Sequence, residues 1–337
     1  MPRRKGENGM KDTAKERGIL SGCIENNTCA VLLSAEKRMA RISELAHFVC
    51  REMLAFFGDD VMTAVCSSDE AREIYEGGKR VLAGRVSLGE ANADEEKIVS
   101  DVISACDRFY FCKAISRFDG RKYTEDDALR WLSDGEQTAP PAAGEKKIAF
   151  MRSRQANEAF SRFAKYIPGG VMPFGEESFA DVCRSVYSGA TEYGLIPVEN
   201  SSDGRLAGLY GTFERYGLYI VMLCDVASPD GEGYTKFALC SRSLGSIKAK
   251  GEKILHIRLT LDSPDGLSDL LFCGKYFGAF LRRADLIPVS AAGRENSFDI
   301  SLCIDNCDLA GLICALKLEY PQFSAVGIYT EIKAEEI

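Results

Sequence analysis

The chain has 337 residues, of which 46% are hydrophobic, and its formal net charge is -8. This length allows two or three domains, and the apolar content is ordinary for a globular protein and too high for general disorder. The negative charge argues against broad binding to nucleic acids or to anionic membranes, because both need clustered positive charge. A small anionic substrate is still compatible with an acidic protein that holds a local arginine pocket.

The start of the chain is basic and polar, without the apolar core of a signal peptide, so residues 1–27 are interpreted as a flexible leader. No apolar run reaches the ~18 residues of a membrane span. The 13 cysteines include no Cys-x-x-Cys pair, which predicts reduced, mostly buried thiols in the cytoplasm. The only histidines, His47 and His256, argue against a histidine-based metal site or a Ser-His-Asp triad, although one could act alone as a base. We expect no metal and no cofactor.

Residues 28–132 carry the apolar spacing of helices. Apolar residues recur at helical spacing between 32 and 57, and Ser67-Ser68-Asp69, with acidic residues in the first turn, indicates the start of a second helix. A third helix is predicted over 94–118, followed by a short helix that carries Trp131. Residues 133–145, rich in Pro, Ala and Gly, are interpreted as a linker.

After the linker the pattern changes to alternating strands and helices, which predicts an α/β layer over 146–245. In the last segment, 252–333, the predicted order is strand, helix, two strands, helix and strand, which is the ferredoxin-like βαββαβ arrangement. The predicted bounds of these six elements are 254–261, 267–283, 287–290, 298–304, 309–318 and 325–330. The expected fold class is therefore multidomain: a helical domain, an α/β lobe and a ferredoxin-like domain.

Three strings carry a family resemblance. The segment from Glu192 to Gly204, which reads EYGLIPVENSSDG, resembles the signature of prephenate dehydratases. Thr235-Lys236-Phe237 resembles that family's Thr-Arg-Phe motif, with lysine in place of arginine. The ferredoxin-like tail is similar to the ACT domain that follows such dehydratases and senses phenylalanine, and its segment Asp262-Ser-Pro-Asp-Gly266-Leu267 stands where that family has a Pro-Gly-Ala-Leu turn. The resemblance covers residues 146–332.

In bifunctional members of this family, an all-helical chorismate mutase precedes the dehydratase. The stretch from Leu32 to Arg38 resembles the first helix of that mutase, and Asp69-Glu-Ala-Arg72-Glu73 resembles its Asp-x-x-Arg-Glu stretch. The resemblance implies that Arg38 and Arg72 bind the carboxylates of chorismate, because guanidinium groups bind carboxylates through two hydrogen bonds, and that Glu73 accepts from its hydroxyl. The alternative is that these residues are solvated surface charges.

Dehydration of prephenate removes water and carbon dioxide together, so it needs a proton donor for the leaving hydroxyl. The resemblance implies that Thr235 serves this hydroxyl and that Asn200 and Ser201 donate hydrogen bonds, with Glu199 orienting them. Lys236 and Phe237 would contact the substrate. The alternative is a capping Asn-Ser-Ser turn beside an ordinary strand.

The length of the middle region separates two hypotheses. The family's dehydratase has two lobes with the substrate between them, but Thr235 lies only 34 positions after Ser201, where the family places its second lobe. The lobe of this chain is thus expected to be truncated. One hypothesis is an enzyme of the phenylalanine branch, a carbon–oxygen lyase that acts on prephenate, with chorismate mutase activity in the helical part. The other is a non-catalytic homologue that binds a metabolite and regulates through the ACT-like domain.

The resemblance also implies partners. The ligand would be a small dianion, prephenate or chorismate, and an aromatic amino acid would act as effector near Gly266 and Leu267. The family's phenylalanine-binding motif is replaced here by Val289-Ser-Ala-Ala-Gly293. ACT domains pair side by side, so a homodimer through the tail is expected.

Overall fold

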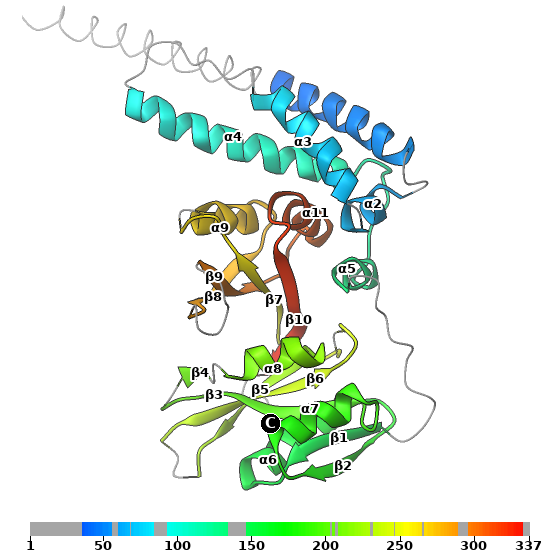
Figure 1. The fold of residues 1–337 in the computed structure, drawn as a ribbon, viewed down its shortest axis with the longest axis vertical. Coiled ribbons are helices and arrows are strands. Elements are labelled where there is room, and N and C mark those ends of the chain that lie inside the picture. The colour runs from blue at the N-terminus through cyan, green and yellow to red at the C-terminus, as the bar shows by residue number, and fades with distance from the viewer. Residues whose placement is uncertain are drawn as a thin grey trace, which may run out of the picture.

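In the computed structural model of the protein, the structure is described for residues 36–55, 60–67, 69–83, 93–133, 146–202, 204–205, 208–229, 232–245, 247–264, 266–288 and 296–332. The expected leader, Leu32-Leu33, residues 134–145 of the expected linker, and Val289 to Gly293 lie outside these residues. Three layers follow one another along the long axis of the molecule: N-terminal helices, a ferredoxin-like tail, and an α/β lobe (Figure 1).

The N-terminal layer is helical. Residues 36–55 form its first helix, and α2 (Val61–Ser67), α3 (Asp69–Ala83), α4 (Ala93–Ser116) and α5 (Glu125–Leu132) follow. The second predicted helix begins at Asp69, as its acidic first turn indicated. Helix α5 opens with a capping box between Thr124 and Asp127, and it buries Trp131.

The α/β lobe contains β1 (Lys146–Met151), α6 (Arg154–Ala164), β2 (Val171–Glu176), α7 (Phe179–Tyr187), β3 (Tyr193–Asn200), β4 (Gly204–Arg205), α8 (Gly208–Tyr216), β5 (Tyr219–Ala227) and β6 (Tyr234–Ser241). Strands β2, β1 and β3 run parallel, and β6 is antiparallel to both β3 and β5. Between β3 and β6 the described residues contain only β4, α8 and β5, so they form one lobe where the family resemblance implies two.

The tail contains β7 (Glu252–Thr260), α9 (Gly266–Tyr276), β8 (Phe280–Leu286), β9 (Ser297–Cys303), α11 (Leu309–Glu319) and β10 (Phe323–Ile332). This is the predicted βαββαβ order, with strands arranged β10-β7-β9-β8. Strand β10 also pairs in parallel with β5 of the lobe, so lobe and tail share one continuous sheet in the order β2-β1-β3-β6-β5-β10-β7-β9-β8.

Two predicted bounds in the tail were wrong. The helix expected over 267–283 ends at Tyr276, and the strand expected at 287–290 is β8, Phe280–Leu286. The helix stops because Gly278 adopts a φ of 86°, and a side chain there would lie 2.9 Å from the carbonyl oxygen of Asn306. Strand β8 was predicted too late in the chain because it lies at the edge of the sheet with most side chains exposed, so it lacks a buried alternation.

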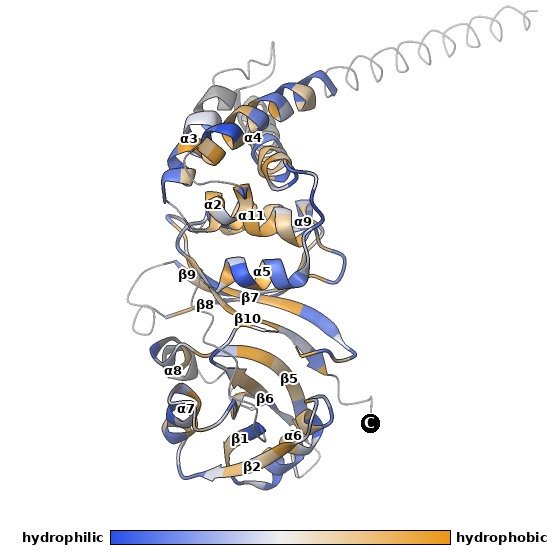
Figure 2. Cartoon of the chain, turned by 90° about the vertical axis from the view of Figure 1, so that its right-hand side faces the viewer, coloured by the Kyte–Doolittle hydropathy of each residue, from blue (hydrophilic) through white to orange (hydrophobic). Residues whose placement is uncertain are grey.

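The N-terminal helices pack on α9 and α11, which cover one face of the tail sheet (Figure 2). One apolar core joins both layers, from Phe109 and Phe111 of α4 to Leu312 and Leu316 of α11. At its edge Glu319, whose side chain is 3% exposed, accepts hydrogen bonds from Tyr75, from Lys79 Nζ at 2.9 Å and from Arg108 Nη1 at 2.8 Å. The helical layer is therefore docked on the tail through a buried, fully paired carboxylate.

Among the residues whose structure is described, none of the helices combines the length and the apolar character needed to cross a bilayer.

Candidate functional site

The dehydratase-like motifs meet at one edge of the lobe. Strands β1 and β3 are parallel, so their carboxyl ends lie at the same edge, and the antiparallel strand β6 begins there. Asn200 and Thr235 are directly opposite each other in the β3–β6 ladder, a relation that places Cβ atoms about 4.5–5.5 Å apart. A distance beyond about 10 Å would have excluded a shared role in proton transfer, which needs hydrogen-bond reach.

Helix α6 brings a third polar side chain to this edge. Its N-cap residue Ser153 accepts a hydrogen bond from the Ala156 N–H at 3.0 Å, so the helix begins beside the end of β1. Gln155, in the first turn, donates from Nε2 to Thr235 Oγ1 at 3.1 Å. Because Gln155 donates to this oxygen, the hydroxyl proton of Thr235 is directed elsewhere and can serve a ligand.

The turn after β3 is clamped to β6. Ser201 donates its N–H to the Tyr234 carbonyl at 3.0 Å, and its Oγ accepts from the Tyr234 N–H at 3.1 Å. Gly233 is required here, because a Cβ atom at that position would lie 2.2 Å from Ser201 Oγ. Asn200 Oδ1 accepts from the Ser202 N–H at 3.0 Å in an Asx turn. Ser201 thus positions the turn, and Asn200 is the residue of the motif that faces Thr235.

Glu199 and Lys236, two further predicted residues of these strands, face the other side of the sheet. Glu199 pairs in register with Lys236, one position along from Asn200 and Thr235, and successive side chains of a strand point to opposite faces. Glu199 accepts from the Tyr234 hydroxyl at 3.0 Å and from Arg283 Nη1 of β8 at 2.6 Å. The predicted site is therefore two sites: Gln155, Asn200 and Thr235 on the α6 face, and Glu199 and Lys236 on the face toward the tail.

Lys236 is bound by carboxylates of the protein itself. It forms an ion pair with Glu331 of β10 and lies 3.5 Å from Asp225 of β5. Burial opposes its charge, but the carboxylate of Glu331 prevails and raises the pKa of Lys236. Phe237 is 3% exposed and lies in the core under α6, and its contact with the substrate stays a prediction. Its apolar side chain follows the inward alternation of β6.

The mutase-like residues stand apart from this site. Arg38 donates from Nε to Asp107 of α4 at 2.8 Å, so a carboxylate of the protein already occupies it. Arg72 has its Nε buried without a hydrogen-bond partner among the described residues, and Glu73 is exposed. In the tail, Gly266 begins α9 and Leu267 packs partly buried against the core beneath the helices. Effector binding by these two residues stays a prediction.

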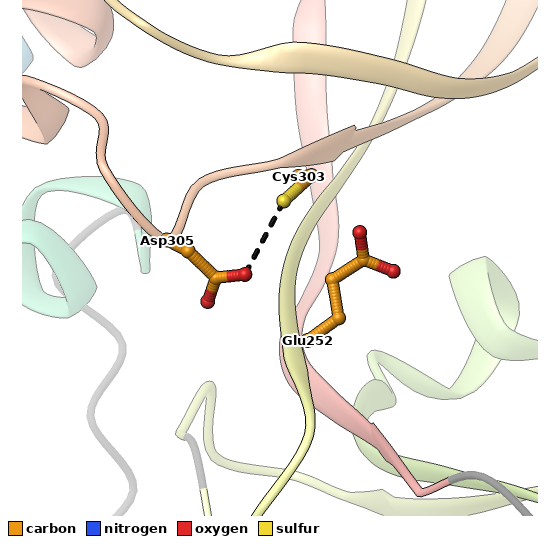
Figure 3. Close-up of side chains that lie close together, drawn as sticks. All are labelled: Glu252, Cys303 and Asp305. Carbon is orange, nitrogen blue, oxygen red and sulfur yellow. Dashed lines mark hydrogen bonds between the residues drawn. The ribbon is translucent and has the colours of Figure 1, made fainter.

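Figure 3 shows a group of potential metal ligands where β7 begins and β9 ends, namely Glu252, Cys303 and Asp305. Their contacts account for the grouping without an ion. Glu252 pairs with Arg282 at 3.0 Å, and Asp305 accepts from the Cys303 thiol at 3.4 Å and from the Lys253 N–H at 3.1 Å. Burial raises the pKa of the Cys303 thiol.

The other cysteines of known position are free and mostly buried. Burial raises the pKa of Cys183 to about 11 and that of Cys224 to about 12, so both are inert thiols at neutral pH. They pack as small apolar side chains in the cores of the lobe.

No family model matches the chain, and no curated protein matches it. Solved structures that are similar to it include a prephenate dehydratase from Streptococcus mutans, at 18% identity and a TM-score of 0.45, which covers 55% of this chain and 98% of the other. A quorum-quenching acylase, GqqA, is 22% identical with a TM-score of 0.42, covering 56% and 96%. A prephenate dehydratase from Arthrobacter aurescens in complex with L-Phe is 15% identical with a TM-score of 0.40, covering 55% and 90%.

Proposed function

We propose that the chain is a prephenate dehydratase-like protein of the phenylalanine branch, which binds prephenate at the edge formed by β1, β3 and β6 and converts it to phenylpyruvate. The observation that carries the proposal is the facing of Asn200 and Thr235 in register, with Gln155 bonded to the threonine hydroxyl at 3.1 Å. Ligands of open α/β sheets bind at such carboxyl ends of strands.

The reaction needs one proton. As the C–O bond to the leaving hydroxyl breaks, Thr235 donates its hydroxyl proton and water departs, while the electrons of the bond to the departing carboxylate complete the aromatic ring and carbon dioxide leaves. Thr235 then regains a proton from solvent, so the reaction consumes one proton overall. The positive N-terminal end of α6 and the exposed guanidinium groups of Arg152 and Arg154 supply the charge that two substrate carboxylates require. Asn200 holds the substrate opposite Thr235.

The test is a prephenate assay on the full chain, with phenylpyruvate formation as the readout. Thr235→Val should lower turnover by about 10²–10⁴-fold, the usual contribution of a positioned proton donor, whereas Thr235→Ser should retain most activity. Equal turnover in the wild type and Thr235→Val would contradict the proposal. Prephenate binding without turnover, measured by calorimetry, would instead favour the non-catalytic, regulatory homologue.

Chorismate mutase activity of the helical layer is a second proposal, resting on the resemblance around Arg38 and Arg72. In this structure Arg38 would have to exchange Asp107 for the substrate. Chorismate consumption by the full chain, lost in Arg72→Met, would support it. No consumption would leave the helical layer with the structural role of covering the tail.

We also propose that the tail has the ACT-like role implied by the family resemblance, with an aromatic amino acid bound near Gly266 and Leu267 and with pairing into a homodimer. The free edge of the shared sheet supports the dimer: on β8, Phe280 is 59% and Leu286 is 65% exposed. Replacing both with Glu should yield a monomer by light scattering. Met172→Glu, on the opposite edge strand β2, is the matched control.

A further inference from the structure

A cavity of about 250 Å³ lies between the lobe and the tail, on the sheet face opposite to Thr235. Its walls come from β3, β5 and β6 of the lobe and from β7, β8, β9 and β10 of the tail, where Figure 1 shows the two parts meeting. The cavity is smaller than the ~300–1,000 Å³ of drug-sized pockets, so it fits a small metabolite. Arg282 and Arg283 are the most exposed of its charged groups and mark its opening.

Every cation that lines the cavity already contacts a carboxylate of the described residues. These cations are Lys236, Arg282 and Arg283. Glu199 and Glu331, which line the cavity, contact Arg283 and Lys236, and Asp225, Glu252 and Asp285 contact the same three cations from outside the lining. The three cations are thus shared among five carboxylates, so a bound anion would have to compete with them. In agreement, burial raises the pKa of Asp225 and the charges of Glu331 and Glu199 add to the rise, although Lys236 lies beside it.

Ser301 points to a ligand independently of these charges. It is 5% exposed and lines the cavity, and its buried Oγ has no hydrogen-bond partner among the described residues. His256 lies directly opposite Ser301 in the β7–β9 ladder. Its Nε2 forms a hydrogen bond of 2.7 Å with Asp299 Oδ1, and its Nδ1 lies 3.4 Å from the Tyr329 hydroxyl. A buried hydroxyl without a partner costs free energy, which a ligand with a hydrogen-bond donor would recover.

The rest of the wall is apolar. Val198, Ile220, Leu223 and Ile254 line the cavity beside the charged groups. A bare inorganic cation would leave this surface and most of the volume without contacts, whereas an organic body would fill it. We propose that the cavity binds a small organic ammonium ion, whose amine donates to Ser301 and to the carboxylates of Glu199 and Glu331, and whose apolar body rests on these four side chains.

This proposal stands apart from the prephenate assay, because the cavity opens on the other face of β3 and β6 and needs no turnover. Two matched pairs of probes test the charge class by calorimetry on the full chain: isobutylamine against isobutyrate, and phenethylamine against hydrocinnamate. At least one amine should bind, its matched carboxylate should not, and potassium chloride at the same concentration should not compete.

Variants test the location. Ser301→Ala should weaken amine binding by about tenfold, the value of one hydrogen bond to a charged donor. Ser301→Leu should abolish it by filling the cavity. Ser297→Ala is the matched control, because this buried serine lies on the same face of β9, bonds to Thr260 at 3.0 Å and does not line the cavity. Equal binding of amine and carboxylate, competition by potassium, or amine binding unchanged in Ser301→Leu would overturn the proposal.

Discussion

The tail has two interfaces, and they use buried charge in opposite ways. Toward the N-terminal helices, Glu319 takes donors from Tyr75, Lys79 and Arg108, and the apolar core continues around it. Toward the lobe, the pairs Glu199–Arg283 and Glu331–Lys236 line a cavity. Each of these cations also contacts a second carboxylate, Asp285 for Arg283 and Asp225 for Lys236. We call the first interface closed, because the buried carboxylate of Glu319 is paired with two cations and the apolar core continues around it. We call the second interface open, because Lys236 and Arg283 each contact two carboxylates and a cavity lies beside them.

The largest effect is expected at the closed interface. Glu319→Gln removes the charge that Lys79 and Arg108 share in a buried setting, so the free energy of unfolding should fall by about 2–4 kcal/mol in urea denaturation. Glu76→Gln is the control, because Glu76 pairs with the same lysine at 3.3 Å but its side chain is 40% exposed, and it should cost less than about 0.5 kcal/mol. Similar losses in the two variants would show that burial does not distinguish them.

A smaller effect is expected at the open interface. Glu199→Gln removes the charge that Arg283 contacts and weakens the hydrogen bond that the Tyr234 hydroxyl donates to Glu199. The free energy of unfolding should fall by about 1–2 kcal/mol. The matched control is Asp285→Asn, which alters a more exposed partner of the same arginine at 2.7 Å and should cost less than about 0.5 kcal/mol. If Glu199→Gln proved as costly as Glu319→Gln, the contrast between the two interfaces would fail.

The smallest effect has the opposite sign and depends on pH. The pKa of Asp225 is raised by burial, so the folded protein binds this proton more tightly than the unfolded chain does. The stability that this bound proton contributes is fully present below the unfolded pKa of about 3.9, and it is lost as the pH rises through the pKa of Asp225 in the folded protein. Asp225→Asn should therefore raise the unfolding free energy at pH 7 by less than about 1 kcal/mol, because the group is partly exposed.

Thermal unfolding of Asp225→Asn and the wild type, followed from pH 7 to pH 4, checks this expectation. The gain should shrink as the pH falls. A variant that is less stable than the wild type at pH 7 would mean that the contact with Lys236 outweighs the cost of burying the carboxylate.

Much of the local structure could be predicted from patterns of short range. The start of α3 at Asp69 and the βαββαβ order of the tail follow from the spacing of apolar residues and from turn chemistry. The bounds of strand β8 could not be found in this way, because an edge strand with exposed side chains has no alternation to detect. Gln155 was missed for a different reason: nothing near it in the chain signals a contact with Thr235, 80 positions later.

The sequence by itself determined the βαββαβ order of the tail and the turn that begins at Asn200, because both depend on neighbouring residues. Only the tertiary structure decided which residues share a site. The alternation of strands β3 and β6 sends Thr235 and Asn200 to one face and Lys236 and Glu199 to the other, although they are adjacent in the chain. Pairing of β7 with β9 and β10 brings His256, Ser301 and Tyr329 around one cavity, since strands distant in sequence meet only when the sheet has formed.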